Sequence, residues 1–280
     1  MTGTLYVVGT PIGNLSDFSL RAAETLAAAD FIAAEDTRVT LKLLNHFGIK
    51  KPLVSYFEHN KRERGEQILA RIEAGETCAL VSDAGMPAIS DPGELLVAQC
   101  AERGIPVLAV PGPTAMASAL AISGLPTGRF TFEGFLSVNK KSRRDHLEEV
   151  KNERRTMVFY EAPHKLYATL RDMLEAWGDR RIAIVRELTK IHEEVVRTTL
   201  SEAAKRCKDD PFKGEIVLVI EGAPAPETAA YTLEEAVALA QERLAQGLAP
   251  SEAAKRAALE SGLAKRDIYR AILQKEPAHD

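Results

Sequence analysis

The chain has 280 residues, of which 45% are hydrophobic and 27% charged, and its formal net charge at pH 7 is −4. This composition is that of an ordinary globular protein, and the negative charge argues against a protein that coats nucleic acid without selection. No apolar run approaches eighteen residues and the first residues lead directly into an expected strand, so we expect a cytoplasmic protein without a membrane-spanning segment or signal peptide.

Residues 1–123 alternate short apolar runs with helical patterns, as an α/β lobe does. The runs are continuous and rich in β-forming residues, which is typical of strands covered on both faces, and they lie at 5–8, 31–34, 53–56, 78–81 and 107–110. Helical patterns lie at 20–29, 38–47, 62–74, 93–103 and 114–122. We therefore expect an open, mainly parallel sheet in this lobe.

Three turns rich in glycine and proline follow strands of this lobe, namely Gly9–Asn14, Ser82–Gly93 and Pro111–Ala115. Ligands of open parallel sheets bind beyond the carboxyl ends of the strands, so three such turns together predict a cleft. The turns contain Asp83 and Asp91 but no Lys or Arg, and they lack the glycine patterns of P-loop and dinucleotide-binding folds. This charge disfavours a phosphate ligand and suits one that carries an ammonium and a sulfonium.

Polar residues follow two of the strands. Glu35 to Arg38 come directly after the strand at 31–34, where Asp36 can either cap the next helix or serve a function, and we favour Arg38 as a contact to substrate. His59 and Asn60 end another strand with hydrogen-bonding groups, as a nucleic-acid contact would.

Residues 124–222 form a second series with more strand and fewer crossovers, so we expect a mixed sheet. Strands are expected at 131–135, 156–160, 182–185, 193–199 and 216–220, and helices near 142–153, 164–177 and 201–208. The aromatic residues of this lobe lie in apolar patterns and are expected in the core: Phe132, Phe135, Phe159 and Trp177.

A basic segment lies at 140–155, with seven basic residues against four acidic ones. Its candidate RNA contacts are Lys140, Lys141, Arg143 and Arg144. The alternative is a solvated helix face with internal ion pairs, which charge alone favours.

Ala223–Glu227 carries two prolines among small residues and reads as a linker. Beyond it we expect a small helical domain over 228–280. Its helices are expected at 233–246, at 251–260 with Ser251 as the N-cap, and at 265–274. The last two helices have the proportions of a helix-turn-helix. The basic residues of this domain are a candidate phosphate-facing surface, with a folding cap or a dimer contact as alternatives: Lys255, Arg256, Lys265, Arg266 and Arg270.

The three cysteines, Cys78, Cys100 and Cys207, are widely spaced and have no accompanying histidine cluster. We expect buried free thiols and no metal site.

The segments Val7–Asn14, Ser82–Pro87 and Val110–Ala115, in this order, resemble the tetrapyrrole-methylase superfamily. The resemblance implies a two-lobed class III methyltransferase fold with S-adenosylmethionine folded between the lobes. The family's Gly-Asp-Pro turn is here Gly85-Met86-Pro87, so an acidic contact at position 86 is missing. The implied cofactor contacts are Pro11, Ile12, Gly85, Met86, Ile89, Thr114, Ala115, Met116, Ala162, Leu188 and Gly214.

Within the superfamily, Ala34–Leu44, Ser55–Asn60 and Arg186–Glu194 resemble the branch that methylates small-subunit ribosomal RNA. The resemblance covers residues 4 to about 222 and the helical tail. It implies 2′-O-methylation of a cytidine ribose in the decoding region of 16S rRNA, and a homodimer, the commonest soluble oligomer.

A 2′-hydroxyl has a high pKa, so the transfer needs in-line placement and a route for the proton. Glu187, Glu35 or a desolvated Lys190 could be the base, because burial lowers the pKa of lysine. The alternative for Glu187 and Lys190 is an ion pair that closes the second lobe. Two other functions stay open: a small-molecule methyltransferase of the corrin type, and a ribosome-assembly factor without catalysis.

Overall fold

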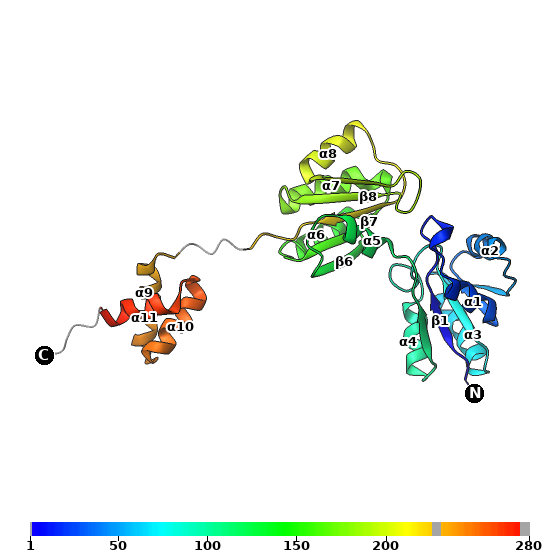
Figure 1. The fold of residues 1–280 in the computed structure, drawn as a ribbon, viewed down its shortest axis with the longest axis horizontal. Coiled ribbons are helices and arrows are strands. Elements are labelled where there is room, and N and C mark those ends of the chain that lie inside the picture. Colours follow the sequence, from blue (N-terminus) through cyan, green and yellow to red (C-terminus); the bar gives the residue numbers. More distant parts are fainter. Residues whose placement is uncertain (1, 226–230, 275–280) are drawn as a thin grey trace. The chain divides into compact units, whose positions relative to one another are not determined.

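The computed structural model describes residues 2–225 and 231–274, in two compact units, Met1–Ala223 and Pro224–Asp280 (Figure 1). The expected linker residues Pro226 and Glu227 lie outside the described residues, as do the ends of the expected tail domain at 228–230 and 275–280. Among the helices of the described residues, none is both long enough and apolar enough to cross a bilayer.

The first sheet is entirely parallel, which agrees with the prediction, and its strand order is β3-β2-β4-β1-β5. The strands are β1 Leu5–Val8, β2 Phe31–Ala34, β3 Leu53–Ser55, β4 Cys78–Val81 and β5 Val107–Val110. Every residue of β2 and β4 is buried, as expected for continuous apolar runs. Because β4, β1 and β5 are neighbours, the three glycine- and proline-rich turns that follow them meet at one edge of the sheet.

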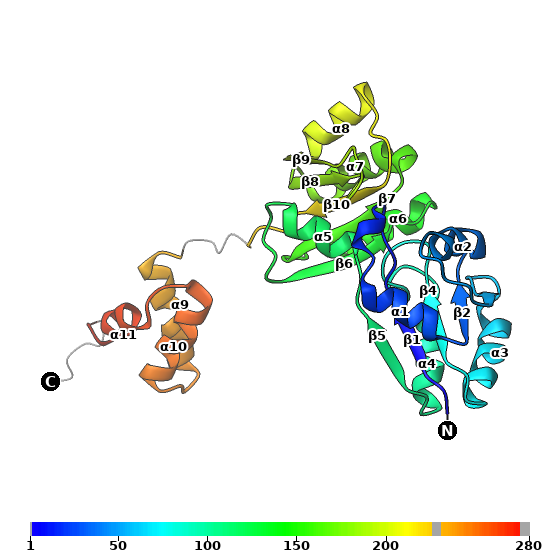
Figure 2. The same cartoon turned by 45° about the vertical axis from the view of Figure 1, so that its right-hand side comes forward.

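Helices cover both faces of this sheet (Figure 2). Side chains of α1 (Leu20–Ala28) and α2 (Thr37–His46) pack on one face. Those of α3 (Lys61–Glu73) and α4 (Glu94–Glu102) pack on the other. The next helix, α5 (Ala115–Ile122), follows β5 in the chain but packs against the second sheet, so it links the two lobes.

The second sheet is mixed, as predicted, with the order β6-β7-β10-β8-β9 and a single parallel pair, β6 with β7. Its strands are β6 Phe130–Phe135, β7 Thr156–Glu161, β8 Arg181–Arg186, β9 Glu194–Thr199 and β10 Ile216–Ile220. The helices that follow its strands are α6 Lys140–Glu149, α7 Pro163–Trp177 and α8 Leu200–Asp209.

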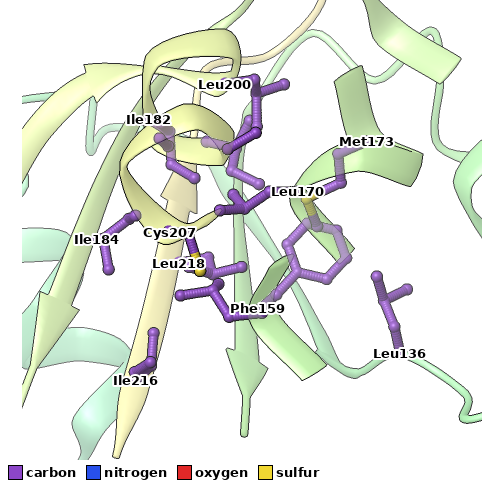
Figure 3. Packing of buried hydrophobic residues seen from close by; sticks show 14 of the residues in the cluster. Leu136, Phe159, Leu170, Met173, Ile182, Ile184, Leu200, Cys207, Ile216 and Leu218 are labelled. Atoms are coloured by element: carbon purple, nitrogen blue, oxygen red, sulfur yellow. The ribbon is translucent and has the colours of Figure 1, made fainter. Parts of the chain in front are cut away.

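The main core of the second lobe lies between this sheet and its helices. Figure 3 shows Phe159 of β7 and Leu218 of β10 facing Leu170 and Met173 of α7, with Cys207 of α8 beside them. Phe159 is fully buried, as the sequence predicts.

The prediction that Phe135 lies in the core is wrong. The residue is 58% exposed, because β6 is an edge strand and its end faces a cavity.

The described residues of the second unit form three helices, α9 (Leu233–Ala245), α10 (Pro250–Ser261) and α11 (Lys265–Gln274). Its core is built mainly from alanines of α9 and α10 against Ile268 and Ile272. Gly262 ends α10 in the left-handed conformation, at φ 74°. The predicted N-cap at Ser251 is wrong, because Ala249 is the cap and Pro250 occupies the first helical position.

Candidate active site

The turns after β1, β4 and β5 are held together by backbone contacts. Thr10 N–H donates to the Gly85 carbonyl (2.9 Å), and Gly85 N–H donates to the Thr10 carbonyl (3.1 Å). Gly9 lies against Gly112 so closely that a Cβ built on Gly9 would fall 2.7 Å from the Gly112 Cα and 2.7 Å from the Met86 Sδ. Glycine is therefore required here by the close approach of two backbones.

These turns form one wall of a cavity of about 380 Å³, hereafter the crevice, and the second lobe forms the other wall. The first lobe contributes Ile12, Ala84, Gly85, Met86, Ile89, Ser90, Asp91, Thr114, Ala115 and Met116. The second lobe contributes Phe135, Tyr160, Glu161, Ala162, Pro163, Val185, Leu188, Gly214, Glu215, Ile216 and Val217. All the cofactor contacts implied by the resemblance line the crevice except Pro11, which precedes Ile12 in the first turn.

Tyr160 joins the two walls. Its hydroxyl accepts a hydrogen bond from the Met116 N–H at the start of α5 (3.1 Å), and burial raises the pKa of its phenol. The rings of Phe132 and Phe135 meet Tyr160 edge-on, with centroids 5.0 and 5.4 Å away. The sequence analysis missed Tyr160, because a tyrosine inside an apolar strand carries no signal of its own.

The charged side chains that line the crevice are acidic. Asp91, Glu161 and Glu215 supply carboxylates, whereas the described residues that line it include no Lys or Arg. The buried Glu161 carboxylate accepts hydrogen bonds from the Ala162 N–H (2.8 Å) and the Thr169 hydroxyl (2.5 Å). Apolar walls with carboxylates and no cation fit a ligand that combines an adenine ring with a sulfonium and an ammonium.

Acidic groups also gather behind the crevice, where β2 and β4 end. The Asp83 carboxylate accepts the Asp36 N–H (3.0 Å), and Asp83 N–H points to the Glu35 carboxylate (3.5 Å). Burial first, and neighbouring carboxylates second, raise the pKa of Glu35. Burial likewise raises the pKa of Asp83 and Asp91.

Asp36 is the N-cap of α2: its carboxylate accepts the Arg38 N–H (2.8 Å) and binds the Arg38 guanidinium (2.6 Å). These bonds hold the pKa of Asp36 at about 2. The sequence left open whether Asp36 caps the helix or serves a function, and in the structure it caps α2. Arg38 is 87% exposed beside it, and its contact to substrate remains a prediction.

Glu187 and Lys190 are ion-paired, 2.9 Å apart, and Lys190 also lies 3.2 Å from the Glu215 carboxylate. The ammonium of Lys190 lowers the pKa of Glu187. Burial alone would lower the pKa of Lys190, but the two carboxylates outweigh it and raise that pKa. The geometry is therefore that of the ion-pair alternative, and the raised pKa favours the charged form of Lys190. A catalytic role for Glu187 or Lys190 stays a prediction.

This ion pair holds a strained loop against the first lobe. Glu187 and Thr189 adopt φ angles of 52° and 65°, which side chains other than glycine rarely adopt. A Cβ on Gly13 would fall 2.7 Å from the Lys190 Cγ, so the turn after β1 rests on the lysine stem.

Two of the expected RNA contacts have structural partners instead. The prediction for Arg143 is corrected: its guanidinium is 13% exposed, binds Asp172 (2.7 Å) and donates to the Ser137 carbonyl (3.2 Å). The Asn60 side chain accepts the Phe57 N–H and donates to the Ser55 carbonyl, so it fixes a turn.

The remaining expected RNA contacts in the first unit lie at the surface. Lys140 and Lys141 are exposed at the start of α6, and His59 is exposed before α3. Arg144 is half-exposed and lies 3.2 Å from the Glu175 carboxylate, as the ion-pair alternative expects.

The expected tail contacts are all exposed within the second unit: Lys255, Arg256, Lys265, Arg266 and Arg270. Lys255 and Arg256 lie 3.8 and 3.6 Å from the Glu252 carboxylate, and Lys265 donates to the Ser251 hydroxyl (3.0 Å). Exposed pairs of this length are weak, so these cations can still meet a phosphate.

The three cysteines are buried and free, as predicted, and burial raises the pKa of Cys78 to about 12. Within the described ranges, no group of histidine, cysteine or acidic residues is arranged to hold a metal ion.

Comparison with known proteins gives consistent matches. Residues 4–204 match the family of tetrapyrrole (corrin/porphyrin) methylases. A protein of Halalkalibacterium halodurans named ribosomal RNA small subunit methyltransferase I is 50% identical over 270 residues, which cover 95% of this chain and 93% of that protein. Proteins of the same name from Synechocystis and Bacillus subtilis are 46% and 44% identical; the matches cover 98% and 95% of this chain and 99% and 93% of those proteins.

Solved structures share the fold at low sequence identity. Uroporphyrin-III C-methyltransferase from Thermus thermophilus superimposes with a TM-score of 0.55 at 19% identity, over 78% of this chain and 94% of that one. Diphthine synthase gives a TM-score of 0.59 at 15% identity, over 78% and 89%. Both matches concern the two-lobed architecture.

Proposed function

The chain belongs to the tetrapyrrole (corrin/porphyrin) methylase family of S-adenosylmethionine-dependent methyltransferases, and from this premise we propose that its methyl acceptor is ribosomal RNA of the small subunit. The observation that carries the proposal is the acidic crevice between the lobes, whose described lining residues include no Lys or Arg, together with relatives of this name that match nearly the whole chain.

Each wall of the crevice has a part in holding the cofactor. S-adenosylmethionine, when bound, supplies a methyl group on a positively charged sulfur. The apolar residues, such as Ile12 and Leu188, would pack against its uncharged parts, and the carboxylates of Glu161 and Glu215 would stabilise its positive charges. The Tyr160 bond to Met116 N–H fixes the two walls relative to each other before the cofactor binds.

The finer proposal is 2′-O-methylation of a cytidine ribose in the decoding region of 16S rRNA by a cytoplasmic homodimer. It is supported by carboxylates beside the crevice that can take up the proton of a hydroxyl. Incubation of purified small subunits with labelled S-adenosylmethionine, followed by ribose-methylation mapping, tests it. We expect one labelled ribose; label on a base contradicts the ribose proposal, and label found only in a tetrapyrrole supports the corrin-type alternative.

A surface prediction concerns the start of α6. Lys140→Glu combined with Lys141→Glu should weaken binding of small subunits and reduce the slope of log K against log salt by about 2, because each lysine neutralises a phosphate. Arg143 is left unchanged, since its pair with Asp172 is structural. Binding measured between 50 and 200 mM salt gives the slope.

The matched control reverses two exposed lysines of α8, Lys205→Glu with Lys208→Glu. The control changes the net charge by the same amount, and the salt slope should stay at the wild-type value. Equal losses in both double variants would mean that net charge, and not this surface, determines the affinity.

A further inference from the structure

A second cavity, of about 400 Å³, opens next to the crevice on the first lobe; we call it the side cavity. The start of α3 and the start of α4 line it, with Glu58, Lys61, Arg62, Asp91, Pro92, Gly93, Glu94, Leu95 and Ala98. Asp91 is the residue that lines both cavities. Asp91 therefore lies where the linings of the two cavities meet.

The side cavity differs from the crevice in its chemistry. It contains cations as well as carboxylates: Lys61 lies 2.6 Å from Glu58, and Arg62 has no carboxylate within ion-pair distance among the described residues. Such a mixture of donors and acceptors suits a sugar with hydroxyl groups and a single phosphate. A flat apolar ring system would find few apolar contacts there.

Asp91 combines a raised pKa with a place in the lining of both cavities, and no other candidate base has both properties. Glu187 and Lys190 satisfy each other in an ion pair, and Glu35 lines neither cavity. Burial is the main cause that raises the pKa of Asp91, and the negative charge of Asp83 also raises it. A hydrogen bond from the Ser82 side chain lowers the pKa, but the net shift is upward. A carboxylate whose pKa is raised is a stronger base than an exposed aspartate.

We propose that Asp91 is the catalytic base of the methyl transfer, and that the acceptor nucleotide places its sugar in the side cavity. The inference rests on the proposed function and adds the acceptor site to it. The acceptor hydroxyl oxygen forms a bond to the methyl carbon, the methyl–sulfur bond breaks with its electron pair left on sulfur, and the hydroxyl proton moves to the Asp91 carboxylate. The products are the methyl ether, S-adenosylhomocysteine with a neutral sulfur, and protonated Asp91, so charge and atoms balance.

Several charged and titratable groups face Asp91 from the elements around it. Those of the first lobe are Glu35, Asp83, Glu58, Lys61, Arg62 and Glu94, and Tyr160 faces it from the second lobe. Burial, and after it the negative charge of Asp83, disfavours the charged form of Asp91. The rate should therefore rise with pH through a pKa above the ordinary aspartate value of about 3.9, as Asp91 loses its proton.

The test compares wild type with Asp91→Asn, and uses Glu102→Gln, an exposed residue at the far end of α4, as the control. On small subunits with saturating cofactor, Asp91→Asn should lower kcat by about 10²-fold or more and lose the rising limb of the pH profile. Calorimetry should give an S-adenosylhomocysteine Kd within about threefold of wild type, a fold-change that corresponds to less than the 1.4 kcal/mol of a tenfold change.

Thermal unfolding at pH 8 gives a readout without any ligand. The folded-state pKa of Asp91 is raised, so its contribution to stability is present at low pH and is lost as the pH rises through that pKa. Asp91→Asn should therefore unfold at the wild-type temperature or above it at pH 8. A lower unfolding temperature would assign Asp91 a structural role and overturn the inference.

The remaining outcomes separate the inference from the proposed function. A kcat within threefold of wild type, or an unchanged pH profile, overturns the base assignment alone. Loss of S-adenosylhomocysteine binding in Asp91→Asn does the same, because it places Asp91 on the cofactor. If wild type labels no small subunit, the proposed function fails, and the inference fails with it.

Discussion

Alanine in place of Gly112 is expected to lower the free energy of unfolding by about 1–3 kcal/mol and to abolish measurable binding of S-adenosylhomocysteine. A Cβ at this position would fall 2.8 Å from the Gly9 Cα and 2.9 Å from the Gly9 carbonyl carbon and oxygen. These are backbone atoms, so no rotation of a side chain relieves the overlap. The turns after β1 and β5 must move apart, and both of them line the crevice.

Thermal unfolding and calorimetry measure the two effects. One kcal/mol corresponds to about 2–4 °C in Tm for a unit of this size. Gly128→Ala is the matched control, because a Cβ there meets nothing within 4 Å, and it should leave both quantities unchanged. Normal cofactor affinity in Gly112→Ala would mean that the crevice does not hold the cofactor.

Methionine in place of Lys190 is expected to lower kcat by about 10- to 100-fold. The change keeps most of the stem that contacts Gly13 but removes the ammonium between Glu187 and Glu215. Two carboxylates then face each other without a cation, in a loop that already holds two residues at positive φ. The loop should relax and widen the crevice, and displacement by about 1 Å can cost about 10²-fold in rate.

Arginine in place of Lys190 separates the two roles that the sequence left open. Arginine keeps a cation between the carboxylates but cannot act as a base, because its guanidinium stays protonated. If the ion pair is what matters, Lys190→Arg should retain most of the activity that Lys190→Met loses, with the wild-type pH profile. Equal loss of activity in both variants would restore Lys190 as a catalytic base. Lys208→Met, on the exposed face of α8, is the control.

The sequence predicted the two sheets well, because short local patterns of apolar residues mark their strands. Continuous apolar runs such as Phe31–Ala34 and Cys78–Val81 form strands buried on both faces. The segment after residue 124, with more strand and fewer crossovers, forms a mixed sheet. The three glycine- and proline-rich turns predicted a cleft, since turns after parallel strands share one edge. The three turns lie next to one another because the strand order puts β1 between β4 and β5.

Pairings between distant elements could not be predicted in the same way. The sequence predicts Arg143 as a free cation, yet it forms an ion pair with Asp172 of α7, which is 29 residues away in the chain. The position of α5 on the second sheet, and with it the Tyr160 bond to Met116, depends on how the lobes pack rather than on a local pattern. Asp91 stands out only when the two cavities that it lines are known.

A crystal structure of the protein with S-adenosylhomocysteine tests the central claim most directly. The account predicts density for the ligand in the crevice, against Ile12, Met116 and Leu188, with its sulfur toward Asp91, which lines both the crevice and the side cavity. Ligand bound elsewhere on the chain, or in the crevice with its sulfur turned away from Asp91, would contradict it.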